Sequence, residues 1–334
     1  MKNPLFVVSI NIILMTVVLF IAETVSYHSL FVEKWYKLPD YNKFKKTEKE
    51  FLVDNHPLIN YEQPKISDPI RFENDGRSFN GKNYNTDGVL LLGDSYTYGL
   101  GLKKEETFGY QLSQYLKKPV YNWGWCTEGL DYDFLVLKNL KNIELIKKSK
   151  NKQQIKYVIL TYTYNQPKRL LLKNRQYRYF LLRQYGLIQN QKASLFDRLY
   201  IVQVIKNKLF LNSLKNGDYQ NNLQNFLFSL ITAIKKEIAK NFPKAKFILL
   251  IYSDDANVIK GKNLQVTETE MNILNSPNWK QLEKYDITVV KTEDLLGRKM
   301  QKDEIIDDEK TITIHPNAKA WRTIIPKLCK KISL

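Results

Sequence analysis

A serine and a histidine that lie far apart in the chain carry the most specific chemical signal in the sequence. Ser95 follows Gly-Asp at the end of a short apolar run, residues 88–92. His315 is the one histidine that comes after it in the 334 residues. A serine hydroxyl becomes a good nucleophile when a neutral imidazole within hydrogen-bond reach removes its proton. The two residue types therefore predict attack on a carbonyl carbon, if the fold brings them together.

The position of Ser95 after an apolar run is typical of a site at the carboxyl end of a buried parallel strand. Other known motifs do not fit these residues. Thr97 stands where the nucleophile elbow G-x-S-x-G needs its second glycine. Gly99 and Gly101 lack the third glycine of a dinucleotide fingerprint, and there is no Walker A motif. Simpler roles stay open, with Ser95 as a helix cap and His315 as a turn residue.

Three further short segments accompany Ser95 in a definite order. The full set is Gly93-Asp94-Ser95 with Tyr96-Thr97-Tyr98-Gly99, then Asn122-Trp123-Gly124, Asn165 and His315-Pro316-Asn317. With these segments in this order, the chain resembles the SGNH (GDSL-type) hydrolases over roughly residues 87–330. The Gly-Asp-Ser segment alone is a weak signal, so the resemblance rests on all four segments.

The resemblance implies a catalytic role for each matched residue. Ser95 would be the nucleophile and His315 the general base. The backbone N–H groups of Ser95 and Gly124 and the amide of Asn165 would form an oxyanion hole. Loss of one such donor typically costs about 3 kcal/mol of transition-state stabilisation.

Three residues next to the matched segments are expected to bind the substrate: Asp94, Tyr96 and Arg169. Arg169 belongs to a basic and aromatic stretch, residues 168–183, that follows the third segment. Such a stretch can lie on an anionic membrane or line a groove for an acidic substrate. A core-packing helix with a solvated basic face is the more common alternative. In each case we expect the stretch to border the site and to help select the substrate.

One departure from the family concerns the residue that orients the histidine. The family usually has an aspartate two or three residues before it, where this sequence has Thr313 and Ile312. Asp308 lies seven residues before His315, next to Asp307, and would reach the imidazole if the loop folds back. We therefore expect Asp308 as the third catalytic residue. The alternatives are a Ser-His dyad, oriented by Thr313 or by a backbone carbonyl, and an inactive family member.

Strand-like and helix-like segments alternate from residue 87 onward, as is typical of a parallel sheet covered on both faces. The expected strands are residues 88–92, 120–121, 155–162, 246–252 and 286–290. The expected helices are residues 106–118, 130–149, 223–240 and 317–331. We predict a three-layer α/β/α domain, residues 87–334, with a mostly parallel, flavodoxin-like sheet of about five strands and an insertion at about 166–218.

The first 23 residues predict a transmembrane anchor. Residues 5–22 are nearly all apolar and uncharged, and as a helix they would reach roughly 27 Å, close to the hydrocarbon thickness of a membrane. Lys2 precedes them, which favours an N-terminus inside the cell. We expect a single-pass protein with residues 24–86 as a stalk and the catalytic domain outside the cytoplasm. The alternative, a signal peptide cleaved near residues 24–26, lacks an A-x-A site.

The composition restricts cofactors and partners. Two cysteines and three histidines are too few for a zinc cluster or a disulfide framework, so we expect no metal and no cofactor. Cys126 and Cys329 could still form one disulfide outside the cytoplasm. A formal net charge of +18 allows a polyanionic partner, but the absence of a nucleic-acid-binding motif leads us to expect no nucleic acid.

Together these features predict a membrane-anchored, extracytoplasmic serine esterase that acts on O-acyl or O-acetyl esters of a small molecule, lipid or polysaccharide. The first alternative is an O-acyltransferase, because some extracytoplasmic relatives in this family acetylate or deacetylate cell-envelope polysaccharides. The second alternative is a non-catalytic envelope-binding module that keeps the fold.

Overall fold

The computed structural model describes most of the region that contains the four matched segments. The described residues are 12–22, 24–25, 87–99, 102–124, 129–138, 155–170, 187, 200–252, 268–308 and 313–334. The chain divides into two compact units, the first made of residues 1–64 and 171–219, the second of residues 65–170 and 220–334. Ser95 and His315 both belong to the second unit.

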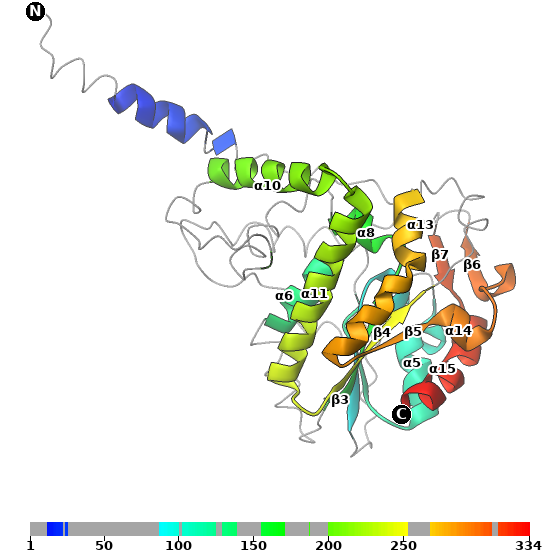
Figure 1. Ribbon diagram of the computed structural model, residues 1–334. Coiled ribbons are helices and arrows are strands. Elements are labelled where there is room, and N and C mark those ends of the chain that lie inside the picture. The colour runs from blue at the N-terminus through cyan, green and yellow to red at the C-terminus, as the bar shows by residue number, and fades with distance from the viewer. Residues whose placement is uncertain are drawn as a thin grey trace, which may run out of the picture. The chain divides into compact units, whose positions relative to one another are not determined.

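The second unit is built on a five-stranded parallel sheet (Figure 1). Its strands are β1 (Gly88–Leu92), β2 (Val120–Asn122), β3 (Ile155–Tyr162), β4 (Lys246–Ile251) and β5 (Ile287–Lys291). They are arranged in the order β2-β1-β3-β4-β5, and each neighbouring pair is parallel. This is the flavodoxin-like order, so the predicted sheet is confirmed. Every residue of β1 is buried, which explains its uninterrupted apolar sequence.

Helices cover both faces of this sheet. Figure 1 shows α6 (Leu130–Lys138) and α11 (Tyr219–Asn241) on one side and α5 (Phe108–Leu116) and α15 (Ala318–Ile332) on the other. Phe108 of α5 stacks on Trp321 of α15, with ring centroids 4.4 Å apart. The buried, apolar faces of these helices complete the three layers that alternating strands and helices predicted.

A small antiparallel hairpin beside the main sheet was not predicted. It consists of β6 (Ile305–Asp308) and β7 (Thr313–Pro316), and its register places Ile306 opposite His315. Residues 305–308 pair two apolar residues with two aspartates and show no strand period, whereas residues 311–315 (Thr-Ile-Thr-Ile-His) alternate polar and apolar side chains, a strand signal that was missed. Also missed were α13 (Glu268–Asn275), α14 (Thr292–Leu296) and the 3₁₀ segment Pro277–Tyr285.

Parts of the predicted anchor and insertion are described. Residues 12–22 are helical, and the large apolar side chains between Ile12 and Ile21 are 49–72% exposed. Among the described residues, no helix has both the length and the hydropathy to cross a membrane. The insertion contributes α8 (Gln166–Leu170) and α10 (Tyr200–Lys215), whereas the basic stretch beyond residue 170 lies outside the described residues.

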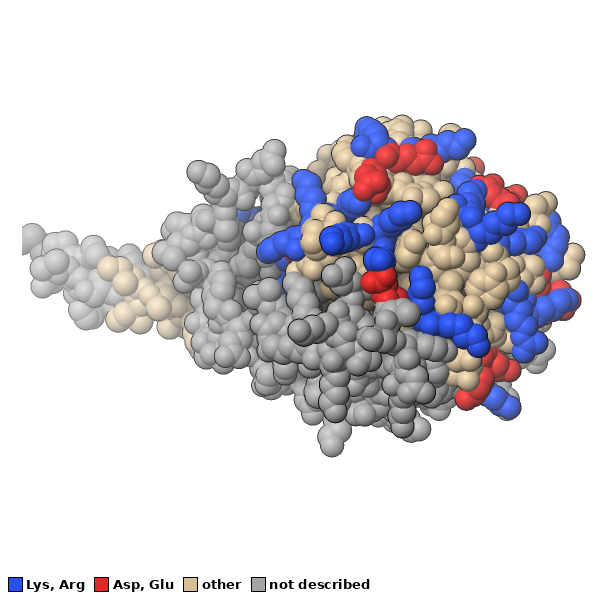
Figure 2. All heavy atoms as spheres, turned by 90° about the horizontal axis from the view of Figure 1, so that it is seen from below, with Lys and Arg blue, Asp and Glu red and all other residues tan. Residues whose placement is uncertain are grey.

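On the face shown in Figure 2, the basic side chains of the described residues are spread over the surface. In this view from below, Lys and Arg predominate, and Asp and Glu are scattered among them across the coloured face. A binding site for nucleic acid usually concentrates positive charge on one face or along one helix. The absence of a nucleic-acid partner stays an expectation.

Candidate active site

Ser95 lies on a sharp turn at the carboxyl end of β1. Gly93 ends the strand with φ +134°, and a Cβ there would collide with the hydroxyl groups of Thr97 and Thr161. Ser95 then begins α4 (Ser95–Tyr98), a single turn that ends at Gly99 with φ 83°. Glycine permits both positive φ values, so this turn can bring Ser95 to the edge of the sheet.

His315 reaches Ser95 from the β6–β7 hairpin. Its Nε2 lies 2.8 Å from Oγ of Ser95, although the two residues are 220 positions apart. Each is 4% exposed. The ring of Tyr96 packs on the imidazole with centroids 4.8 Å apart, and Tyr252 packs on Tyr96 at 5.2 Å. The structure therefore brings the proposed nucleophile and base within hydrogen-bond distance in a buried position.

Burial keeps the imidazole neutral. It lowers the pKa of His315 to about 4, because water no longer solvates the charged form. The carboxylate of Asp94 opposes this change, and the guanidinium of Arg169 adds to it. A neutral imidazole that accepts a hydrogen bond at Nε2 carries its proton on Nδ1. Nδ1 is buried without a hydrogen-bond partner in the described part of the chain.

The low pKa of His315 affects activity and stability in opposite ways as the pH falls. The base form persists at mildly acidic pH, whereas the free energy of unfolding decreases. The base form of His315 persists well below pH 6.5, so we expect the acid limb of the kcat/KM profile near pH 4. Between these two values an unfolded chain binds a proton at this histidine and the folded chain does not, so stability falls as the pH is lowered from 6.5 to 4. Rate profiles and urea unfolding measure the two effects. An acid limb near pH 6.5 would contradict the buried, neutral imidazole.

The predicted third catalytic residue lies on the strand next to His315. Asp308 ends β6 and pairs with Thr313, two residues before His315 on β7. The hairpin thus folds the loop back, as the prediction for Asp308 requires. The side chains of Asp307, Asp308 and Thr313 lie outside the described residues, so the role of Asp308 stays a prediction.

Gly124 packs against the turn that carries Ser95. A Cβ at position 124 would lie 2.5 Å from Cβ of Thr97 and 2.7 Å from the backbone nitrogen of Tyr98, so only glycine fits. Its N–H donates to Oδ1 of Asn122 at 3.0 Å, and Nδ2 of Asn122 donates to the Thr97 carbonyl at 2.8 Å. Because this N–H already has an acceptor, Gly124 would have to give up that bond to serve an oxyanion. Its role as an oxyanion donor stays a prediction.

Asn165 lies at the same edge of the sheet as Ser95. It follows β3, which pairs directly with β1, and it precedes α8. Its side chain is half-buried, and its backbone carbonyl accepts the N–H of Arg169 at 3.0 Å. This location agrees with the expected role of Asn165 as an oxyanion donor. That its side-chain amide donates to the oxyanion stays a prediction.

The structure does not favour direct substrate contacts by Asp94 and Tyr96. Asp94 is fully buried, and its carboxylate accepts hydrogen bonds from Tyr96 N–H, Thr163 and Arg169. Tyr96 is 2% exposed and packs on the histidine. The Arg169 side chain is 13% exposed and forms an ion pair with Asp94. We therefore correct the expectation for Asp94, whose carboxylate is occupied by protein donors and closed to a substrate.

Several polar residues around the site were not anticipated. Asp133 of α6 accepts the N–H of Gly93 at 2.9 Å, and the hydroxyls of Thr97 and Thr161 are hydrogen-bonded to each other. Gln166 accepts the N–H of Leu130, which begins α6. These residues could have been noticed in the sequence as polar residues inside otherwise apolar segments. Such residues indicate a buried polar network, since buried polar groups need hydrogen-bond partners.

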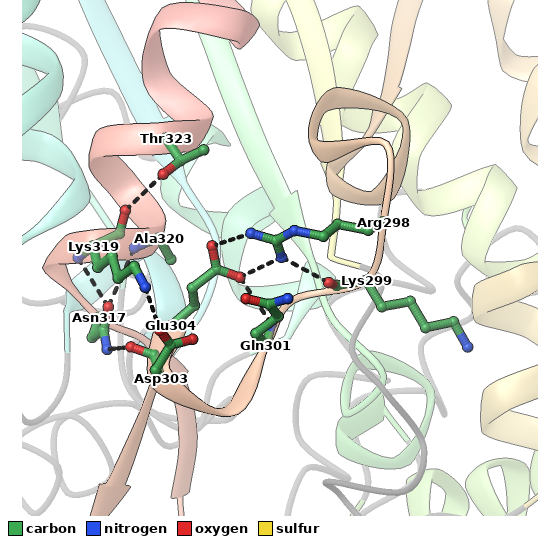
Figure 3. Close-up of polar contacts among 9 residues, drawn as sticks. All are labelled: Arg298, Lys299, Gln301, Asp303, Glu304, Asn317, Lys319, Ala320 and Thr323. Atoms are coloured by element: carbon green, nitrogen blue, oxygen red, sulfur yellow. Dashed lines mark hydrogen bonds and ion pairs between the residues drawn. The ribbon is translucent and has the colours of Figure 1, made fainter.

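A second polar network supports the hairpin that carries His315 (Figure 3). Arg298 forms two hydrogen bonds of 2.7 Å with the carboxylate of Glu304, which also accepts the N–H of Gln301 at 2.8 Å. The Glu304 carbonyl accepts the N–H of Asn317 at 2.9 Å. Asn317 caps α15 by accepting two backbone N–H groups. The network therefore links the start of β6, which follows Glu304, to the junction of β7 and α15 at Asn317.

Glu304 makes a testable contribution to stability. Its side chain is 1% exposed, and the Arg298 guanidinium holds its pKa below the ordinary value. A lowered carboxyl pKa stabilises the fold at neutral pH, and this stabilisation is lost as the pH falls through the lowered value. We expect Glu304→Gln to reduce the free energy of unfolding by about 1–3 kcal/mol at pH 7, with a smaller difference from wild type once the pH is below the lowered pKa of Glu304.

Urea unfolding at both pH values measures the effect of Glu304→Gln. Asp303→Asn is the matched control, because the Asp303–Lys319 ion pair is more than half exposed on both sides. Exposed pairs contribute little, so the control should change stability by less than about 1 kcal/mol. An equal loss in both variants would contradict a special role for the buried carboxylate.

Metal and disulfide chemistry find no support in the described residues. They contain no group of three His, Cys, Asp or Glu side chains that could hold a metal ion. Cys329 is a free, buried thiol, and burial raises its pKa to about 11. Cys126, the suggested partner of Cys329, lies outside the described residues, so the pairing stays a prediction.

Comparison with known proteins identifies similar folds. No family model and no curated protein matches the sequence. TesA is similar at 13% identity over 74% of this chain and 98% of its own, with a TM-score of 0.42. A GDSL-like lipase from Bacteroides thetaiotaomicron is similar at 10% identity over 80% and 98%, with a TM-score of 0.40. AlinE4, an SGNH-hydrolase family esterase, is similar at 14% identity over 74% and 95%, with a TM-score of 0.36.

The last two of these neighbours carry names of the GDSL or SGNH type.

Proposed function

We propose that the chain is a serine esterase of the SGNH type that hydrolyses O-acyl esters. The single observation that carries the proposal is the 2.8 Å contact between Ser95 Oγ and His315 Nε2. A nucleophile and a neutral base within hydrogen-bond reach are the minimum machinery for acyl transfer. The contact also supports catalysis over the alternative of a non-catalytic binding module.

The proposed reaction has two steps. Ser95 Oγ attacks the acyl carbon while Nε2 of His315 takes the hydroxyl proton. The bond to the alcohol oxygen then breaks, and His315 returns the proton to the leaving alcohol. Water attacks the acyl-enzyme with His315 as base, the bond from Oγ to the acyl carbon breaks, and the proton returns to Oγ. Asn165 and backbone N–H groups would stabilise the negative oxygen in both steps.

The proposal is tested by hydrolysis of p-nitrophenyl acetate and by covalent labelling with a fluorophosphonate. We expect the full chain to do both near pH 7. Folded protein that neither hydrolyses the ester nor reacts with the probe would contradict the proposal and would favour the binding module.

Acyl transfer to an alcohol is the second candidate function. The observation that favours it is the low exposure of Ser95 and His315, 4% each, because exclusion of water protects an acyl-enzyme from hydrolysis. An acyltransferase would release p-nitrophenol faster when a polysaccharide or another sugar acceptor is added and would yield the O-acyl sugar. An esterase would release acetate at the same rate with or without the acceptor.

We also propose that Asp308 orients His315. The support is its register position on β6, beside the strand that carries the histidine, together with the lack of a described partner for Nδ1. A carboxylate that accepts the Nδ1 proton stabilises the imidazolium formed during attack. Asp308→Asn should then lower kcat far more than Asp307→Asn. Equal effects would favour a Ser-His dyad.

We propose in addition that the N-terminal segment anchors the chain in a membrane, with the catalytic unit outside the cytoplasm. The exposed apolar side chains between Ile12 and Ile21 support this proposal, because water disfavours such a surface. The full chain should remain in the membrane fraction after carbonate extraction, and the variant without residues 1–23 should not. Recovery of the full chain in the soluble fraction would contradict the anchor.

A further inference from the structure

We propose that the buried ion pair between Asp94 and Arg169 is a positioning pair, which locks the nucleophile to the segment that carries Asn165 and balances the charge beside His315. The inference rests on the proposed function and deepens it. The two residues act through Ser95 and His315, and we assign neither of them a bond to the substrate.

One carboxylate oxygen of Asp94 fixes the nucleophile. Oδ1 accepts the backbone N–H of Tyr96 at 3.0 Å, which makes Asp94 the N-cap of α4. This helix has only four residues, so the capped turn is the whole element. A side-chain cap fixes the direction in which such a turn starts. The position of Ser95, the first residue of the turn, therefore depends on Asp94.

The other oxygen of Asp94 holds the segment around Asn165. Oδ2 accepts the hydroxyl of Thr163 at 2.7 Å, Nη1 of Arg169 at 2.5 Å and the amide of Gln166 at 3.5 Å. These donors come from both sides of Asn165 in the sequence, and the backbone N–H of Arg169 also donates to the Asn165 carbonyl at 3.0 Å. A single carboxylate thus connects the nucleophile turn with the segment expected to bind the oxyanion.

The pair also balances charge at the histidine. Asp94 is fully buried and the Arg169 side chain is 13% exposed, so water screens neither charge well. The negative charge of Asp94 raises the pKa of His315, and the positive charge of Arg169 lowers it. Two uncharged residues also lie next to His315. The ring of Tyr96 on α4 packs on its imidazole, and the apolar Ile306 on β6 is its partner in the hairpin register. Removal of one partner should therefore expose His315 to the unbalanced charge of the other.

A histidine titration by NMR tests this balance directly. The sequence has three histidines, so replacement of His28 and His56 leaves His315 as the only imidazole signal. In that background we expect Arg169→Met to raise the pKa of His315 and Asp94→Asn to lower it. The double variant should return toward the wild-type value. A purely structural loosening would move both single variants in the same direction.

Kinetics test the positioning role. We expect each single variant to reduce kcat for p-nitrophenyl acetate and the rate of fluorophosphonate labelling by about 10–100-fold, because small displacements of a nucleophile cost that much. KM should change by less than about threefold, since the pair does not bind substrate. Arg169→Lys keeps the charge and should hold the pKa of His315 near wild type while it restores part of the rate.

A matched control separates this pair from ion pairs in general. Glu237→Gln breaks the Lys138–Glu237 ion pair of 2.5 Å between α6 and α11, which touches none of the residues above. The control should leave kcat, labelling and the His315 titration unchanged. If Asp94→Asn does not fold, the comparison of Arg169→Met with Arg169→Lys tests the same balance.

The proposal is overturned if the two single variants shift the pKa of His315 in one direction or leave it unchanged. It is also overturned if Arg169→Met raises KM and leaves kcat intact, because Arg169 would then contact the substrate as the sequence suggested. The titration does not require activity. A failure of the proposed esterase function would appear as wild-type protein without labelling, while opposite shifts of the His315 pKa would still support the pair.

Discussion

Replacement of Ser95 by alanine is expected to lower kcat/KM for p-nitrophenyl acetate by more than about 10³-fold and to abolish fluorophosphonate labelling. The variant loses the oxygen that would form the acyl bond, and no other nucleophile in the described site contacts His315. The fold should persist, because the change removes one hydroxyl and one hydrogen bond, a loss of about 1 kcal/mol. Steady-state kinetics, labelling and thermal unfolding measure these three outcomes.

Ser229→Ala is the matched control for this experiment. Ser229 is an exposed serine on α11, and its hydroxyl bonds only to the carbonyl one helical turn before it. Activity and labelling should equal those of wild type. Full labelling of Ser95→Ala would show that the probe reacts elsewhere and would remove the nucleophile from the proposal.

Replacement of His315 by alanine is expected to have a similarly large effect, again more than about 10³-fold on kcat. Without the imidazole, nothing in the described site takes the proton of Ser95, and a serine hydroxyl near its ordinary pKa attacks slowly. Because the two residues act as a unit, the double variant with Ser95→Ala should be hardly slower than either single variant. Single-turnover kinetics of all three variants measure this non-additivity.

The control for His315→Ala is His56→Ala, a histidine to which we assign no catalytic role. It should retain wild-type activity and stability. If the effects of Ser95→Ala and His315→Ala simply multiply, the two residues act independently, and the 2.8 Å contact is not the catalytic one.

Much of the sheet could be predicted from the sequence for a simple physical reason. Strands buried on both faces need continuous apolar runs, and β1, β3 and β4 have them within one residue of the predicted ends. Parallel pairing follows from the helices that alternate with the strands and cover both faces of the sheet. The β6–β7 hairpin was missed although residues 311–315 alternate polar and apolar side chains, because residues 305–308 (Ile-Ile-Asp-Asp), which pair with residues 313–316, show no such alternation.

The site was predicted in part. The types of Ser95 and His315 were visible, because a nucleophile and a base are recognisable as chemical groups, whereas the expected role of Asn165 came from the family resemblance. The role of Asp94 was not visible, because nothing local distinguishes an aspartate that contacts a ligand from one that accepts four hydrogen bonds inside the protein. That distinction requires knowledge of which donors surround it.

The sequence by itself determined the chemical groups and the strand that carries the nucleophile, since both depend on residues next to each other. Only the tertiary structure decided that His315 meets Ser95 and that Arg169 faces Asp94, because these pairs join positions 220 and 75 residues apart. It also decided that the imidazole is neutral. The pKa of a side chain depends on the water and the charges around it, and the fold arranges both.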